Sequence, residues 1–288
     1  MGCTEVAEAL PLVAQPDLAS QVQAVEQDGY VYLPAVLDAE QTAELRAHMD
    51  RLQPNPESFD RGHDPERDGF INRHVNNAFN RDPHFVQFLD YPGVIEIAEA
   101  LHGAGCHSIG MTSWITGPGR PDQTLHTDWL PISLPEDVAA DPRVRLPIFI
   151  TTAHVYLDDI TEEMGPTVIV PGSHRSGRAP DANRRNDRSR ANGGAVPAQP
   201  AAEWNGVGEH SPLCKAGDCL FFRCELWHRG AANHSDRVRH TFMIHYAHRM
   251  ITQKFPPYLK FRFDPEIVAR ATPRQRRLLG EHAQSNYD

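Results

Sequence analysis

The segment IGMTSWIT, residues 109–116, is where the chain changes from helical patterns to short runs of β type. Glycine and proline separate it from later runs of the same kind at 148–157, 167–170, 218–224 and 240–247. Short strands broken in this way are typical of a jelly roll, and the strand–helix alternation of a doubly wound fold is absent. We therefore predict a mainly β fold with flanking helices, a double-stranded β-helix of the cupin-like kind.

The rest of the chain is arranged around these strands as a single catalytic domain, residues 1–288. Residues 1–105 are predicted to form a helical N-terminal buttress with one early strand. The double-stranded β-helix occupies 106–250, and 251–288 form a C-terminal helical tail. The stretch 173–212 is polar, rich in arginine and too long for an ordinary connection, so we predict an insertion that is a solvated loop, a lid or a subunit contact.

Helix ends are marked by residues that satisfy free backbone groups. Asp38 can cap a helix while Gln41, three residues later, reciprocates. Further starts are predicted at Asp264 and at Thr272, each followed by proline, and Gly280 is placed to end the last helix.

Composition narrows the class of protein. Of the 288 residues, 40% are hydrophobic, which allows a sizeable core, and no apolar run reaches the ~18 residues of a membrane span. The net charge of -10 argues against nucleic acid and anionic membranes as partners and favours a small-molecule substrate. The five cysteines show no CxxC spacing and follow no secretory signal, which predicts reduced thiols and a cytoplasmic location. A homodimer is the assembly we consider.

Two short motifs carry the chemistry. In QTLHTD, residues 123–128, His126 and Asp128 stand two residues apart, a spacing that on a strand turns both side chains to one face. A third ligand candidate, His228, follows in LWHRG, residues 226–230. Two histidines and one carboxylate on one face of a metal, with the other positions open, describe a non-heme Fe(II) oxygenase site.

An arginine after the last of these histidines could bind a dicarboxylate cosubstrate, because a guanidinium matches a carboxylate with two parallel hydrogen bonds. Arg239 follows His228 by eleven residues, and Arg237 follows it by nine. On a strand both arginines would face the same way, so parity does not separate them.

At these motifs the chain resembles the phytanoyl-CoA dioxygenase family of Fe(II)/2-oxoglutarate oxygenases. The segments that carry the resemblance are DGYVYLPAVL (28–37), QTLHTD (123–128), GPTVIVPGSH (165–174), GDCLFF (217–222) and WHRG (227–230). The resemblance implies two sets of binding residues. For iron it implies His126, Asp128 and His228; for 2-oxoglutarate it implies Arg239, in preference to Arg237, with Gln123 and Thr167.

The resemblance also implies the reaction. Oxidative decarboxylation of 2-oxoglutarate by O2, giving succinate and CO2, would drive oxidation of an unactivated C–H bond in a small organic molecule. Hydroxylation is the expected outcome, and desaturation, ring closure, epoxidation and endoperoxide formation stay open. Halogenating relatives carry a small residue where Asp128 stands, so halogenation is disfavoured.

The motifs are closer to the natural-product branch of the family than to the acyl-CoA branch, which favours a specialised metabolite as substrate. Three alternatives remain: an acyl-CoA hydroxylase of the same family, a cupin-type metalloenzyme that does not use 2-oxoglutarate, and a non-catalytic binding module. An activity that survived Arg239→Ala would indicate the second, and absence of succinate formation with any substrate would indicate the third.

Four residues near the motifs are candidates for contact with the substrate: Asn72, Arg73, Trp129 and Trp227. On a regular strand the two tryptophans would point away from the neighbouring ligands, so a packing role is equally expected for them. Among the sixteen histidines, His154 and His245 stand in β-type runs and are interpreted as structural imidazoles.

Overall fold

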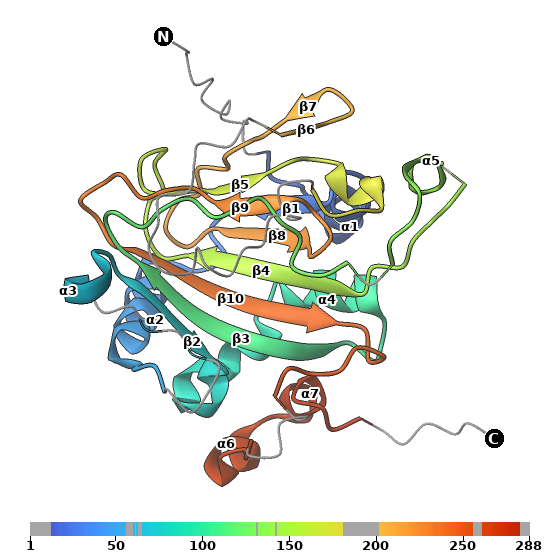
Figure 1. Ribbon diagram of the computed structural model, residues 1–288. Helices are drawn as coiled ribbons and strands as arrows, with labels where there is room; N and C mark the ends of the chain where they lie inside the picture. Colours follow the sequence, from blue (N-terminus) through green and yellow to red (C-terminus); the bar gives the residue numbers. More distant parts are fainter. Residues whose placement is uncertain are drawn as a thin grey trace.

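A computed structural model describes residues 13–55, 60, 62, 65–130, 132–141, 143–180, 202–255 and 261–282. Its centre is a six-stranded antiparallel sheet that combines strands from both ends of the chain (Figure 1). In spatial order the strands are β1 (Tyr30–Leu33), β8 (Cys219–Arg223), β4 (Ile150–Tyr156), β10 (Arg239–Ala247), β3 (His107–Thr116) and β2 (Asn72–Asn76).

A smaller sheet covers one face of the large one. Its two strands are β5 (Thr167–Ile169) and β9 (His228–Gly230). Isolated bridges extend it on both sides, from His126 to His228 and from Ile169 to His210. The hairpin of β6 (Glu203–Trp204) and β7 (Val207–Gly208) lies beyond it (Figure 1). Two antiparallel sheets with a space between them form the predicted jelly roll.

Helices cover the other face of the large sheet, where α4 lies behind β10 and β3 (Figure 1). The longer helical elements are α1 (Leu18–Gln27), α2 (Ala39–Arg51), η2 (Pro83–Asp90) and α4 (Ile95–His102). The shorter ones are α3 (Pro65–Asp68), η1 (Ala78–Asn80), α5 (Glu136–Ala139), η3 (Ser173–Ser176), α6 (Pro265–Arg270) and α7 (Pro273–Leu278).

The alternation of side chains along the central strand β10 assigns its two faces. Phe242 and Ile244 are buried in the main hydrophobic core against the helices. Burying one such side chain stabilises the fold by about 1.5–3 kcal/mol. Thr241, Met243 and His245 have the opposite parity and point between the two sheets, where the site lies.

The predicted helix ends are confirmed. Asp38 and Gln41 form a reciprocal capping box at the start of α2. Asp264 caps α6, Thr272 caps α7 with a capping box of its own, and Gly280 has a φ of 111° just after α7. Each cap satisfies an amide that the first helical turn leaves free, typically stabilising the helix by about 1 kcal/mol.

The N-terminal third differs from its prediction in one respect, because it contributes two strands rather than one. Residues 72–76 form β2, which pairs with β3 at the edge of the large sheet. Of these five residues only Val75 is fully buried, so the segment lacks the apolar alternation that marks a strand. Within the predicted insertion 173–212, residues 181–201 lie outside the described part of the chain, including Arg184, Arg185, Arg188 and Arg190.

Candidate metal centre

Two histidines from distant parts of the chain face each other across a backbone bridge. The amide of His126 donates to the carbonyl of His228, and the amide of His228 donates to that of His126, both at 2.9 Å. Their ring centroids are 4.5 Å apart. Asp128 completes the group, with carboxylate oxygens 3.7 Å from His126 Nε2 and 3.6 Å from His228 Nε2. The ligand atoms of all three residues lie within 4.8 Å of one another.

Both imidazoles are held by the backbone two residues earlier. His126 Nδ1 lies 2.7 Å from the Thr124 carbonyl oxygen, and His228 Nδ1 lies 2.8 Å from that of Leu226. Since a carbonyl accepts but does not donate, each Nδ1 carries the proton and each Nε2 keeps its lone pair. Burial alone would raise the pKa of Asp128, but the neighbouring His228 and His126 hold it well below its usual value. The donor set fits a divalent cation with open positions.

One other trio among the described residues brings potential ligands together, but its rings are wrongly oriented. Glu44, His48 and His84 have ligand atoms within 4.8 Å of one another. The rings of His48 and His84 stack 3.8 Å apart at an interplanar angle of 5°. A metal lies close to the plane of each imidazole that binds it, and two stacked, nearly parallel rings have no such position in common within bonding distance of both. His48 Nδ1 is also engaged by Asp82 at 2.5 Å.

A cavity of about 410 Å³ opens over the first trio. Of the residues predicted for the site, it is lined by Asn72, Gln123, Thr167 and the three metal-ligand candidates. Arg73 points the other way, with its guanidinium against the carbonyls of Met49 and Asp50 at the end of α2. Parity explains the difference, because Arg73 and Asn72 are neighbours on β2. We therefore withdraw Arg73 as a substrate contact.

The two tryptophans also lie outside the cavity lining. Trp227 is 4% exposed and packs with Trp204, while its indole N–H donates to the Arg178 carbonyl at 2.9 Å. Trp129 is 44% exposed. Trp227 therefore has the packing role that was the alternative for both tryptophans. Neither tryptophan lines the cavity, so the structure does not support either one as a substrate contact.

Arg239 is not among the residues that line the cavity; it stands at the first position of β10, at one end of the row in which Met243 and His245 line the cavity. Its side chain is 2% exposed, its guanidinium lies 5.3 Å from the Trp114 ring centroid, and Nη1 donates to the carbonyl of Gly165. Within the described residues it forms no ion pair, and its buried Nε has no hydrogen-bond partner. The competing Arg237 is exposed before β10 begins. Of these two arginines, Arg239 is therefore the buried cation, and it has no ion-pair partner among the described residues.

Gln123 and Thr167 lie beside the same end of the cavity. Gln123 forms two hydrogen bonds with Gly230: its backbone N–H donates to the Gly230 carbonyl at 2.9 Å, and its side-chain oxygen accepts from the Gly230 backbone N–H at 2.8 Å. Thr167 pairs with Gly230 across β5 and β9 and accepts a hydrogen bond from the Tyr156 hydroxyl at 2.7 Å. Both residues line the cavity next to the metal-ligand trio.

Three further residues of the site had not been predicted. His154 and His245 line the cavity, each less than a tenth exposed and each with an unpartnered Nδ1. Burial, followed by the electrostatic effect of the neighbouring His228, lowers the pKa of His154 to about 3, so this imidazole is neutral. Arg120, 4% exposed, lies 5.2 Å from the Trp114 ring, and its guanidinium donates to the carbonyls of Gly230 and Ala231. His245 shares the parity of Arg239 on β10, a signal that the sequence contains, whereas His154 reaches the cavity through the cross-strand pairing of β4 with Met243, which no local pattern gives.

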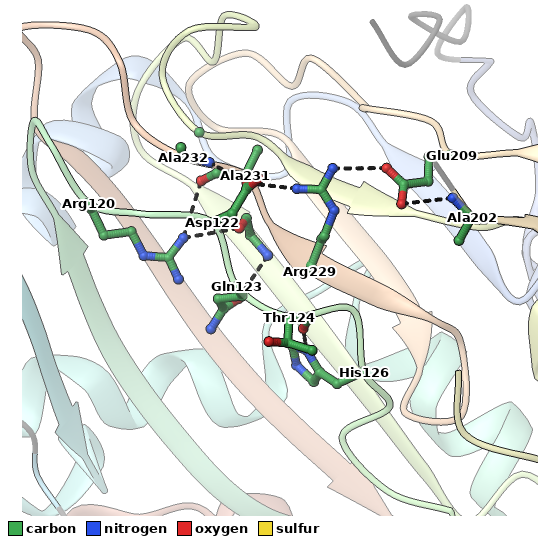
Figure 2. Close-up of polar contacts among 12 residues, drawn as sticks. Arg120, Asp122, Gln123, Thr124, His126, Ala202, Glu209, Arg229, Ala231 and Ala232 are labelled. Atoms are coloured by element: carbon green, nitrogen blue, oxygen red, sulfur yellow. Dashed lines mark hydrogen bonds and ion pairs between the residues drawn. The ribbon is translucent and has the colours of Figure 1, made fainter. Parts of the chain in front are cut away.

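The backbone around the ligands is braced by one arginine, as Figure 2 shows. Arg229, next to His228, pairs with Asp122 at 2.7 Å and with Glu209 at 2.9 Å. Asp122 also accepts from the amide of Ala232, and Glu209 accepts from that of Ala202. These contacts join the segment before His126 to the strand that carries His228.

Comparison with known proteins agrees with this geometry. A family model described as phytanoyl-CoA dioxygenase matches residues 25–241. The chain belongs to this family. The prediction of a non-heme Fe(II)/2-oxoglutarate-dependent dioxygenase is thereby confirmed, together with Fe(II), 2-oxoglutarate and O2 as its cofactor and cosubstrates.

The chain is also similar to the dioxygenase aneA of Aspergillus aculeatus, with 28% identity over 228 residues, which are 76% of this chain and 68% of that protein. The epimerase SnoN, solved with Fe3+, alpha-ketoglutarate and nogalamycin RO, is 24% identical with a TM-score of 0.58 over 80% of this chain and 83% of that one. HygX of Streptomyces hygroscopicus, solved with nickel and 2-oxoglutarate, is 16% identical with a TM-score of 0.58 over 81% and 88%. The two structures confirm the predicted jelly-roll fold.

Proposed function

We propose that His126, Asp128 and His228 bind Fe(II), and that the enzyme uses this site to oxidise a small specialised metabolite. The observation that carries the proposal is the donor geometry: two Nε2 atoms and a carboxylate within 4.8 Å, with both Nδ1 atoms held by carbonyls. The relatives support the substrate class, since SnoN is an epimerase solved with nogalamycin RO.

Arg239, Gln123 and Thr167 are proposed to bind 2-oxoglutarate. A buried guanidinium without an anion favours binding of the distal carboxylate, because the cost of desolvating the cation has already been met on folding. Gln123 and Thr167 offer polar side chains in the lining of the same cavity as the metal-ligand trio. Arg120 adds a second buried positive charge beside Trp114 and so favours a dianion at this end of the cavity.

Fe(II), when bound, supplies the redox chemistry that couples decarboxylation of the oxo acid by O2 to oxidation of the substrate. The balance for hydroxylation is R–H, 2-oxoglutarate and O2 giving R–OH, succinate and CO2. Asp128 fills the carboxylate position, which favours hydroxylation over halogenation. The neutral imidazole of His154 faces the trio without adding a charge to it.

Anaerobic titration of Fe(II), and then of 2-oxoglutarate, into metal-free protein tests the proposal. We expect a weak visible charge-transfer band from the chelate in the wild type and loss of iron binding in His126→Ala and His228→Ala, with the circular dichroism of the fold retained. His234→Ala is the control, because His234 is an exposed histidine outside the cavity lining. Full iron binding in either ligand variant would show that the metal is held elsewhere.

Location and assembly are proposed on narrower grounds. None of the described helices has the length and apolar character needed to cross a bilayer. Four cysteines, Cys106, Cys214, Cys219 and Cys224, are buried free thiols, which supports a reducing compartment such as the cytoplasm. Cell fractionation tests the location. The homodimer stays a prediction, and light scattering of the purified protein tests it.

A further inference from the structure

The end of the cavity opposite Arg239 contains a second cation. The strand β10 runs along the cavity from Arg239 to His245, about 20 Å at the rise of an extended chain. Met243, between them, lies opposite His154 of β4 and lines the cavity. If 2-oxoglutarate is bound at the Arg239 end, the cavity beyond Met243 is left for the substrate.

Lys254 lines this far end. Its amide donates to the carbonyl of Ile109 at 3.0 Å, and its Cδ would lie 3.7 Å from a Cβ placed on Gly110. Gly110 is the register partner of His245, so the lysine chain crosses the sheet next to that imidazole. Within the described part of the protein Lys254 forms no ion pair, whereas the other cavity cation, Arg229, has two.

His245 supplies a built polar group beside this cation. It is 9% exposed, lines the cavity, and its Nδ1 has no hydrogen-bond partner. Burial, followed by the charge of Lys254, lowers its pKa, so the ring is a neutral hydrogen-bonding group. A buried polar atom without a partner destabilises the empty site, and a bound polar ligand removes that cost.

The remaining walls at this end are polar and lack negative charge. Asn76, Asn77 and Thr112 line this part of the cavity. Asn76 is the last residue of β2 and pairs with Thr112 of β3, which in turn pairs with Met243. Among the described residues that line the cavity, Asp128 is the only acid, and it belongs to the metal-ligand trio. Apolar side chains are few, so the lining does not suit a long acyl chain.

We propose that the substrate is a small, hydrophilic carboxylic acid whose carboxylate is bound by Lys254 and His245. One unpaired ammonium group matches one negative charge, and the cavity of about 410 Å³ has to hold the cosubstrate as well. This inference rests on the proposed function, because it takes the Arg239 end for 2-oxoglutarate. It makes Lys254 the residue that selects acids over neutral analogues.

Matched pairs of probes test the inference: a set of N-acetyl amino acids and the corresponding N-acetyl amino acid amides. Binding to the anaerobic Fe(II)- and 2-oxoglutarate-loaded protein is measured by ligand-observed NMR and by the shift of the visible band. We expect acids to bind about 10-fold more tightly than their amides, the size of one charge-assisted hydrogen bond. Lys254→Met removes the preference and Lys254→Arg retains it. Lys215→Met is the control, because Lys215, exposed like Lys254, lies outside the cavity lining and beside Asp159.

Three results would overturn the inference: acids and amides binding alike, no acid binding, or an acid preference that survives Lys254→Met. The visible band separates this failure from failure of the proposed function. If the band forms in the wild type and in Lys254→Met while the acid preference is absent, only the substrate class is wrong. If the band never forms, the proposed function is wrong.

Discussion

Replacing Arg239 by methionine should separate cosubstrate binding from folding. Methionine fills a similar volume without the charge, and the guanidinium it removes is 2% exposed and has no ion-pair partner among the described residues. In the metal-free protein the substitution removes one hydrogen bond to Gly165, which destabilises the fold by about 1 kcal/mol. It also removes the destabilising effect of burying an unpaired positive charge. These effects oppose each other, so we expect the metal-free variant to be about as stable as the wild type.

Binding of 2-oxoglutarate should be affected far more. Hydrogen bonds to charged groups contribute about 1.5–3 kcal/mol, so loss of the salt bridge raises the Kd roughly 100-fold. At a concentration 100 times the wild-type Kd, 2-oxoglutarate stabilises the wild type by about 2.7 kcal/mol and the variant by only about 0.4 kcal/mol. For a domain of this size the difference is roughly 5–9 °C in Tm.

The assay is anaerobic thermal unfolding with Fe(II), in the presence and absence of 2-oxoglutarate. Arg237→Met is the matched control, because that arginine lies two residues earlier and is exposed. If Arg239→Met kept the full 2-oxoglutarate-dependent rise in Tm, or if Arg237→Met lost it, the assignment of the distal carboxylate to Arg239 would be refuted.

Other substitutions test the packing, the pH response and the cosubstrate end. Gly217→Ala should destabilise the fold by about 2–4 kcal/mol in urea denaturation, because φ is 93° and the new Cβ would clash with the backbone carbonyl of Leu37. The control Gly93→Ala has a similar φ of 83° but open space around the new Cβ, so it should destabilise the fold by only about 1–2 kcal/mol. Equal losses of stability in the two variants would contradict the steric reasoning. Burial lowers the pKa of His102 to about 4 from 6.5, so between these pH values only the unfolded state binds this proton, and the stability of the fold falls as pH falls. His102→Gln should reduce the slope of this decline by up to about 1.4 kcal/mol per pH unit. An unchanged slope between pH 6.5 and 5 would contradict the assignment of the decline to His102. Gly230→Ala would place a Cβ 2.9 Å from Nη1 of Arg120, which has to move, and should raise the Kd for 2-oxoglutarate about 10-fold, as measured by anaerobic titration. An unaltered Kd would show that Arg120 can move away from the new Cβ without affecting the cosubstrate.

Much of this architecture was predictable because its signals are local. The capping residues Asp38 and Thr272 act within three positions of themselves, and both caps are present. The strands β3, β4, β5, β8 and β10 are apolar enough to be recognised individually. The candidate ligands His126 and Asp128 come within 3.7 Å of each other, although their segment forms an isolated bridge and a bend rather than the regular strand that the spacing argument assumed. Their meeting with His228 depends on backbone pairing and was expected from the family resemblance.

The substrate end was less predictable, because it is assembled by register rather than by sequence neighbours. His245 faces the cavity only because β10 pairs with β3 and β4 as it does, with a register shift directly after that residue. Asn76 belongs to a strand whose polar composition hides it. Arg120 enters through contacts with backbone carbonyls more than a hundred residues away, which no local pattern encodes.

The backbone bridge between His126 and His228 has a consequence for metal supply. Because main-chain hydrogen bonds join His126 to His228, the fold itself holds the two proposed nitrogen ligands side by side. A rigid face of two nitrogens and one oxygen suits several divalent ions, and their intrinsic affinities rise from manganese through iron and cobalt to nickel and copper. Iron loading in the cell would therefore depend on which metals are available, and a wrongly loaded enzyme could be rescued by exchange without unfolding.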